Sequence, residues 1–215
     1  MRFLLIHTAG AEGSVALASE TGVVRSEVLP GRSSSERLVP AVRRLMESAG
    51  WTLGGLTAVV AVHGPGSFTG VRVGLSAAKG LCEAGGVPLI AVSRLALLAA
   101  AGCADYALLD AGRGEFYYGE YDGRRSVLEA LLHRDDAHTA VGAGVVAVCE
   151  AKVAEAFGGL NLRMVEEPLA GAALPFAVER AMAGDFDDVA VVDANYLRRT
   201  DLEIFAKAKA EGLMR

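Results

Sequence analysis

The chain has 215 residues, of which 52% are hydrophobic and 22% charged, with a formal net charge of −5. A chain of this length can bury a hydrophobic core as one domain or as two small lobes. The acidic balance and the dispersed Lys and Arg residues argue against autonomous nucleic-acid binding, because phosphate contacts need clustered cations.

The N-terminal segment predicts a group of strands followed by a helix. Apolar and alternating runs between glycine-marked turns predict three strands: Arg2 to Ile6, Gly13 to Ser19 and Val23 to Val28. A helix is expected next, because Ser33 and Glu36 have capping-box spacing and apolar residues recur at helical intervals from Leu38 to Ala49.

Single strands and helices then alternate. The β-branched run from Thr57 to Val62 is typical of a strand covered on both faces. The stretch HGPGSFTGVRVGLSAAKG, residues 63 to 80, follows directly and leads into a second helix. Pro88 to Val92 predicts a further strand, and Arg94 to Ala101 predicts a third helix. The expected order of this half is therefore β-β-β-α-β-α-β-α.

The second half of the chain resembles the first. LLIHTAGAEGSVALASETG, from Leu4, and ALLDAGRGEFYYGEYDG, from Ala107, share an apolar strand, a polar residue, a Gly-rich turn and a second strand. In this comparison His7 falls opposite Asp110. The pattern favours two lobes built on one plan, and the alternative is a chance similarity between two Gly-rich hairpins. We expect an N-terminal lobe over residues 1–102 and a smaller C-terminal lobe with a tail over residues 103–215.

Elements of the second half follow from the same patterns. A strand over Phe116 to Tyr121 is expected to pair with one over Arg125 to His133, and a short strand is expected near Val189. Helices are expected over Val145 to Phe157 and over Ala172 to Ala183. The last part, residues 201–215, predicts a loosely held helix or a frayed end.

The Gly-rich stretch before the second helix has three interpretations, of which two are disfavoured. It lacks P-loop spacing, and Gly64, Gly66 and Gly70 miss the dinucleotide fingerprint by one residue, although a strand, a Gly-rich turn and a helix start remain a general anion site. Ser67 follows Gly66 directly and so does not occupy a nucleophile elbow. Ser67 and Thr69 are better interpreted as turn and helix-capping hydroxyls.

The third interpretation is a contact surface. Gly70, Gly74, Ala77 or Ala78, and Leu81 fall on one face of the predicted helix, so another helix can approach it closely. The alternative is that this face packs on the chain's own sheet. The residues alone leave both open.

Several stretches match a known family. GPGSFTGVRVGLSAAKGL from Gly64 to Leu81, with SSERLVPAVRRLM, LLDAGRGEFYYGEYD and NYLRR, resembles the bacterial TsaB family, also called YeaZ. The resemblance covers the chain from Arg2 to Arg199. It implies an α/β, actin-like (ASKHA, ribonuclease H-like) fold with two lobes and mixed sheets flanked by helices, which agrees with the internal repeat.

The resemblance also implies a function. Members of the family take part in making N6-threonylcarbamoyladenosine (t6A) in tRNA, where a TsaD paralogue transfers the threonylcarbamoyl group and TsaB is a non-catalytic partner that activates it. The partners implied are a TsaD-like paralogue and a TsaE-like ATPase. The chain alone is expected to form a homodimer, to contact tRNA only through the complex, and to have no membrane association.

The family's pairing surface and motif loop can be placed on this sequence. The implied partner interface consists of Leu38, Val42, Leu45, Gly70, Val71, Gly74, Leu75 and Ala78. The motif loop consists of Gly64, Pro65, Gly66, Ser67, Thr69 and Arg72. No catalytic residue is expected.

Two positions depart from the family pattern. His7 stands where the family usually has Asp, in the hairpin that handles phosphate and metal in nucleotide-binding relatives. Imidazole is a poor substitute for a carboxylate in holding hydrated Mg²⁺, so nucleotide binding would depend on Asp110 and Gly112. We expect no cofactor on this subunit alone and leave ATP or ADP open for the complex. Ser34 stands where the family often has His, with a small expected effect.

An enzyme acting alone is the rival interpretation. An actin-like fold is compatible with an ATPase or small-molecule kinase that uses Asp110 and nucleotide loops containing Gly112, Gly114, Gly142 and Gly144. A glycoprotease-like hydrolase is the other form of this alternative. No nucleophile, base and orienting group can be named for it.

Histidine and cysteine usage argues against a metal site and a disulfide framework. The histidines lack ligand spacing: His7, His63, His133 and His138. The cysteines are odd in number and far apart, which favours reduced thiols and a cytoplasmic location: Cys82, Cys103 and Cys149. The longest apolar run is too short to cross a bilayer.

Overall fold

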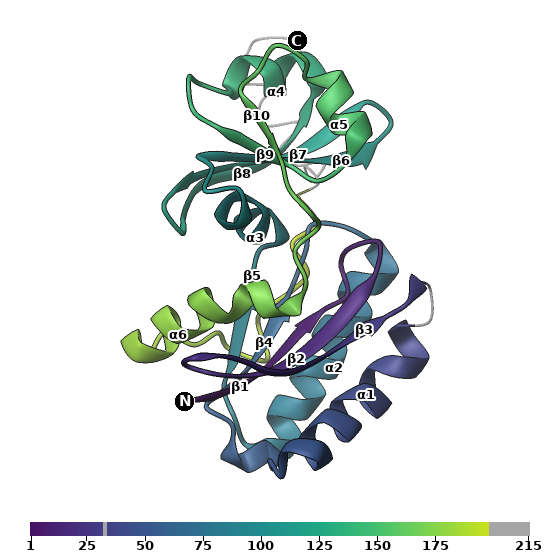
Figure 1. Cartoon of the computed structure of the whole chain (residues 1–215), viewed down its shortest axis with the longest axis vertical. Coiled ribbons are helices and arrows are strands. Elements are labelled where there is room, and N and C mark those ends of the chain that lie inside the picture. Colours follow the sequence, from purple (N-terminus) through teal and green to yellow (C-terminus); the bar gives the residue numbers. More distant parts are fainter. Residues whose placement is uncertain (32–33, 198–215) are drawn as a thin grey trace, which may run out of the picture.

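The computed structural model describes residues 1–31 and 34–197, which form two lobes, each with a mixed five-stranded sheet (Figure 1). The first sheet contains β1 (Arg2–His7), β2 (Gly13–Ser19), β3 (Gly22–Leu29), β4 (Ala58–Val62) and β5 (Leu89–Val92). The second contains β6 (Tyr106–Gly112), β7 (Glu115–Asp122), β8 (Arg125–His133), β9 (Val146–Val148) and β10 (Leu162–Met164).

Both sheets have the same strand order. It is β3-β2-β1-β4-β5 in the first and, counted from the matching edge, β8-β7-β6-β9-β10 in the second. In each sheet the first strand pairs antiparallel with the second and parallel with the fourth. The predicted repeat is confirmed, and the fold is α/β, actin-like (ASKHA, ribonuclease H-like), with two mixed sheets flanked by helices.

The first sheet is covered on both faces, as its apolar strands predict. Leu4 and Ile6 of β1 pack with α1 (Ser34–Ala49) and α2 (Phe68–Gly85), whereas Phe3 and Leu5 point to the opposite face. This alternation follows from the period of two residues along a strand. A short 3-10 helix, η2 (Leu53–Gly55), links α1 to β4.

Three further helical elements join the lobes. The third helix, α3 (Arg94–Ala101), packs against β6, β7 and β9 of the second sheet. The chain then returns, and η3 (Ala170–Ala173) and α6 (Leu174–Ala183) lie on the first sheet (Figure 1). One hydrophobic cluster therefore contains residues of both sheets, α3 and α6. The expected boundary between the lobes lies after residue 102. Helix α3 precedes this boundary but packs on the second sheet, and α6 follows it but packs on the first sheet.

Some expected elements differ in the structure. The helix expected over Val145 to Phe157 is strand β9 followed by the short helix α5 (Ala151–Ala156). Another short helix, α4 (Arg134–Ala140), follows β8 and had not been expected. The strand expected near Val189 is not formed, and Asp187 instead makes an isolated bridge with Leu89. The proposed cap at Ser33 and the tail over residues 201–215 lie outside the described residues.

Two glycines let α2 lie unusually close to the end of β1. A Cβ on Gly70 would overlap the backbone oxygen of Thr8, and a Cβ on Gly74 would overlap its Oγ1. The Thr8 hydroxyl also donates a hydrogen bond of 2.6 Å to the Gly70 carbonyl oxygen. By contrast, a Cβ on Gly80 would meet nothing within 4 Å. Gly70 and Gly74 therefore serve the chain's own packing, and Gly80 does not.

Matched substitutions in α2 test this difference. Gly74→Ala is expected to lower the free energy of unfolding by about 1–3 kcal/mol, because the added methyl group overlaps a hydrogen-bonded side chain. Gly80→Ala is expected to raise it by about 0.5–1 kcal/mol, because Ala favours the helix and the site is open. Urea unfolding followed by circular dichroism measures both. Changes of the same sign would contradict the packing described.

Candidate functional site

A cleft of about 550 Å³ lies between the lobes. Its first wall is formed by the turn between β1 and β2 and by the loop that precedes α2. Its second wall is formed by the start of α3, the end of β6 and the start of α5. The charged side chains in its lining are Arg94, Asp110, Glu150, Lys152 and Glu167. Of these charged side chains, the sequence analysis named only Asp110 as a site residue, together with the neighbouring Gly112.

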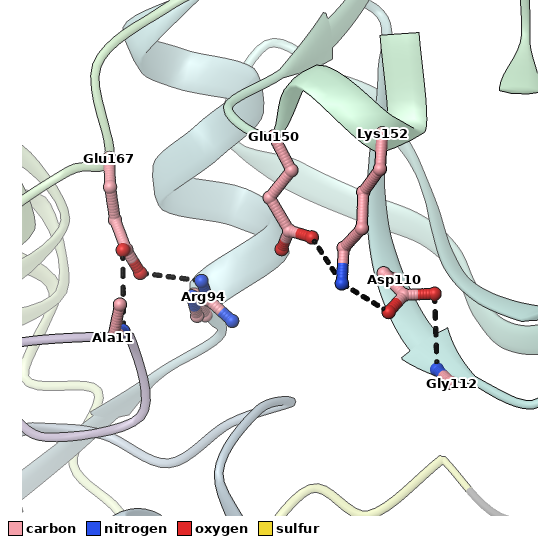
Figure 2. Close-up of polar contacts among 7 residues, drawn as sticks. All are labelled: Ala11, Arg94, Asp110, Gly112, Glu150, Lys152 and Glu167. Carbon is pink, nitrogen blue, oxygen red and sulfur yellow. Dashed lines mark hydrogen bonds and ion pairs between the residues drawn. The ribbon is translucent and has the colours of Figure 1, made fainter. Parts of the chain in front are cut away.

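Asp110 and Gly112 lie together in the cleft, but their polar groups are already paired. The Gly112 amide donates a hydrogen bond of 3.1 Å to Asp110 Oδ1, and Lys152 Nζ lies 2.6 Å from Asp110 Oδ2 (Figure 2). Burial opposes ionisation of Asp110, but the hydrogen bonds from Lys152 and Gly112 outweigh it and lower the carboxyl pKa. Lys152 also lies 3.5 Å from Glu150.

His7, at the end of β1, is buried and neutral. Its Nδ1 accepts a hydrogen bond of 3.2 Å from the Ala9 amide. Burial, with a smaller contribution from the nearby Arg94 charge, lowers its pKa to about 3. Its Nε2 has no hydrogen-bond partner among the described residues. His7 is therefore uncharged and brings no negative charge to the end of β1.

A pair that the sequence analysis missed, Arg94 and Glu167, crosses the cleft. The Arg94 guanidinium forms an ion pair with the Glu167 carboxylate, whose other oxygen accepts a hydrogen bond of 3.3 Å from the Ala11 amide (Figure 2). Arg94 is only 7% exposed. No motif indicated this pair, because its partners are 73 residues apart in the chain.

The motif loop packs against the first wall of the cleft. Ser67 caps α2 by accepting a hydrogen bond from the Gly70 amide, as predicted, and its own amide donates to the Ala9 carbonyl oxygen at 2.9 Å. Gly66 allows close contact, because a Cβ there would overlap the Ala9 carbonyl oxygen. No described histidine or acid is hydrogen-bonded to the Ser67 hydroxyl, so the loop carries no serine-based triad.

The charged groups of the cleft are already paired with one another, which disfavours the binding of an external phosphate there. Phosphate oxygens need cations and free amides, whereas both cations of the described lining are paired with carboxylates and the Ala11 amide is occupied by Glu167. The three carboxylates outnumber the two cations in this lining. Within the described residues, no group of three or more His, Cys, Asp and Glu is arranged to hold a metal ion.

Among the helices that the structure describes, none combines the length and the apolar character that a membrane span requires.

The residues expected to face a partner are turned inward, and this expectation is wrong. Seven of them are buried in the chain's own core or against its own sheet: Leu38, Val42, Leu45, Val71, Gly74, Leu75 and Ala78. Gly70 is partly buried beside Thr8. The alternative that the sequence left open, in which this face packs on its own sheet, is the one observed, since the apolar side chains of α1 and α2 have that sheet to cover.

The opposite side of α2 is open. We call Thr69, Arg72, Ser76, Gly80 and Ala84, all exposed, the outer row of α2. Phe68 flanks this row and is 57% exposed. The Arg72 guanidinium lies 3.8 Å from the centre of the Phe68 ring and its Nε donates to the Tyr196 hydroxyl at 2.6 Å. An arginine that contacts two neighbouring aromatic rings thus stands at one end of a row of small residues.

Comparison with known proteins identifies the family. A family model described as "TsaD: tRNA N6-adenosine threonylcarbamoyltransferase" matches residues 16–186. The tRNA threonylcarbamoyladenosine biosynthesis protein TsaB of Escherichia coli is 36% identical over 127 residues, 56% of this chain and 55% of that protein. The solved structure of YeaZ from Pseudomonas aeruginosa matches with a TM-score of 0.78 and 28% identity, covering 91% of this chain and 99% of that one. The chain belongs to the TsaB (YeaZ) family.

A second TsaB relative agrees with this assignment. TsaB of Bacillus subtilis is 34% identical over 137 residues, 61% of this chain and 60% of that protein. The chain spans about 55–60% of the length of the curated relatives it matches. The chain is thus a homologue of tRNA threonylcarbamoyladenosine biosynthesis proteins named TsaB.

The buried His7 of this TsaB-family chain gives a pH dependence that can be measured. Its pKa is about 3 in the folded chain and 6.5 in the unfolded chain, so the unfolded chain binds more protons between these values and stability falls as pH drops below 6.5. Between pH 7.5 and 4.5 this contribution is about 2–3 kcal/mol. His7→Asn, which keeps an acceptor for the Ala9 amide but does not titrate, should lose that much less over the same range in denaturant titrations. Parallel pH profiles for the two proteins would contradict a buried, neutral His7.

Proposed function

We propose that this chain is the non-catalytic partner subunit in the synthesis of t6A in tRNA, and that it pairs with and activates a catalytic TsaD-like paralogue. Family membership supports the pathway. The observation that carries the role of partner is the outer row of α2, an exposed helix surface that the chain's own packing leaves uncovered.

The composition of this outer row supports helix-to-helix contact. Gly80 lies in the middle of α2, where glycine costs about 1 kcal/mol relative to alanine. Inside the chain nothing requires it, since a Cβ at this position would meet nothing within 4 Å. With Ser76 and Ala84 on the same side, Gly80 allows the backbone of a second helix to come close. Phe68 and Arg72 supply side chains of the kinds that dominate binding energies at interfaces.

The pairing of the charged groups in the inter-lobe cleft supports the proposal that this subunit performs no chemistry. Its lysine, arginine and Asp110 are engaged with one another or with neighbouring carboxylates, and Ser67 caps a helix. A catalytic base or nucleophile would need a perturbed pKa, a partner group that orients it, and a position within reach of a substrate. The chemistry is therefore assigned to the paralogue.

The remaining partners follow from the same proposal. When the paralogue is absent, the outer row of α2 pairs with that of a second copy, because a two-fold related helix presents the same small residues. A TsaE-like ATPase joins the complex, and ATP or ADP binds there and not to this subunit alone. Contact with tRNA is made only through the complex, since the chain carries a net charge of −5.

One charged substitution on α2 tests the partner role. Gly80→Arg is expected to weaken binding to the TsaD-like paralogue at least tenfold, because a long charged side chain separates the two helices, and t6A formation should fall with it. Isothermal titration calorimetry and an assay of threonylcarbamoyl transfer with the purified paralogue measure the two effects. The site is open, so the variant itself should fold normally.

A matched variant controls for the added charge. Met182, on α6, is 76% exposed and lies away from α2, so Met182→Arg should leave binding and transfer unchanged. Equal effects of the two substitutions, or none from Gly80→Arg, would place the contact elsewhere. Rapid hydrolysis of ATP or of a glycoprotein by the isolated chain would contradict the accessory role itself.

A further inference from the structure

We propose that the Glu167 carboxylate is a built-in anion ligand of the inter-lobe cleft, where it takes the place that an oxygen of an external phosphate would occupy. The turn between β1 and β2 receives this carboxylate from the chain itself. The inference concerns the isolated chain and does not rest on the proposed partner.

Glu167 lies on the segment by which the chain returns from the second lobe to the first. Before it, the Val165 amide donates to the Val148 carbonyl oxygen on β9 at 2.9 Å. After it, the Ala170 amide donates to the Ser14 hydroxyl on β2 at 2.8 Å in a buried hydrogen bond. The carboxylate is therefore held between one anchor on each sheet.

The carboxylate bridges groups from separate parts of the cleft. One oxygen pairs with the guanidinium of Arg94, which stands where the chain passes from the first lobe to the second. The Arg94 amide donates to the Gly64 carbonyl oxygen of the motif loop, and α3, which Arg94 begins, packs on the second sheet. The other accepts from the Ala11 amide in the β1–β2 turn of the first sheet (Figure 2). A cationic side chain and a backbone amide at a turn are the donors that a bound phosphate oxygen would use.

Gly10, which precedes Ala11 in the turn, leaves room for this carboxylate. A Cβ on Gly10 would overlap the Glu167 carboxylate, so any larger residue at this position of the turn would push the carboxylate away. Gly10 is not in the left-handed backbone region, so close approach and not backbone conformation explains the glycine. The lack of a side chain at Gly10 therefore leaves space in the turn that the Glu167 carboxylate fills.

The buried positive charge of Arg94 explains why the Glu167 carboxylate remains in the cleft. Arg94 is 7% exposed, and its Nε has no hydrogen-bond partner among the described residues, so its charge depends on Glu167 for compensation. Lys152 is held separately by Asp110 and Glu150. An external phosphate would have to displace Glu167 and add further negative charge to a lining in which carboxylates already predominate.

Removal of the Glu167 charge tests the proposal on the full chain. Glu167→Ala and the isosteric Glu167→Gln are expected to speed hydrogen exchange of the Ala11 amide at least tenfold, because the carboxylate that accepts from it is lost. Glu166→Gln, an exposed neighbour with the same change of charge, is the control and should leave this exchange rate unchanged.

The addition of inorganic phosphate tests whether Glu167 acts through its negative charge or only fills space in the cleft. In Glu167→Ala, phosphate should restore protection of the Ala11 amide by pairing with Arg94, whereas sodium chloride of equal ionic strength should not. The wild-type chain should show no response to phosphate or to ATP. Unchanged exchange in both Glu167 variants, no restoration by phosphate, or phosphate binding by the wild-type chain would each overturn the proposal.

Discussion

The close packing of α2 on the end of β1 is the constraint on which the rest of the structure depends. Gly70 and Gly74 bring the helix against Thr8, whose hydroxyl binds the helix backbone. The Ser67 amide then reaches the Ala9 carbonyl oxygen and fixes the β1–β2 turn. That turn forms one wall of the cleft and presents the Ala11 amide to Glu167. A sequence block that suggested phosphate binding or partner contact thus serves first to position a hairpin.

This packing also decides which surfaces remain for function. The apolar sides of α1 and α2 are used to cover the first sheet, and the charged groups of the cleft are paired with one another. The two lobes share one hydrophobic core, and the Arg94–Glu167 ion pair lies between them. The exposed side of α2 remains available to a partner, which is consistent with a subunit that acts by contact.

Much of the fold was predictable, because it depends on local pattern. Strand alternation, the buried run of β4 and the repeated hairpin predicted two similar lobes. The long-range features were not predictable: the return of α6 to the first sheet and the pairing of Arg94 with Glu167 depend on contacts that leave no local motif. Small residues in α2 indicated close approach correctly, but spacing alone could not tell whether the neighbour was the chain's own β1 or another protein. The structure separates Gly74, which faces Thr8, from the open Gly80.

The central claim is that the partner covers the exposed side of α2, and hydroxyl-radical footprinting of the complex with the TsaD-like paralogue tests it most directly. Phe68, which flanks the outer row and is 57% exposed, should become strongly protected on binding. Phe186, 39% exposed after α6, is the matched aromatic control and should be labelled at the same rate with and without the partner. Unchanged labelling of Phe68 together with protection of Phe186 would contradict the account.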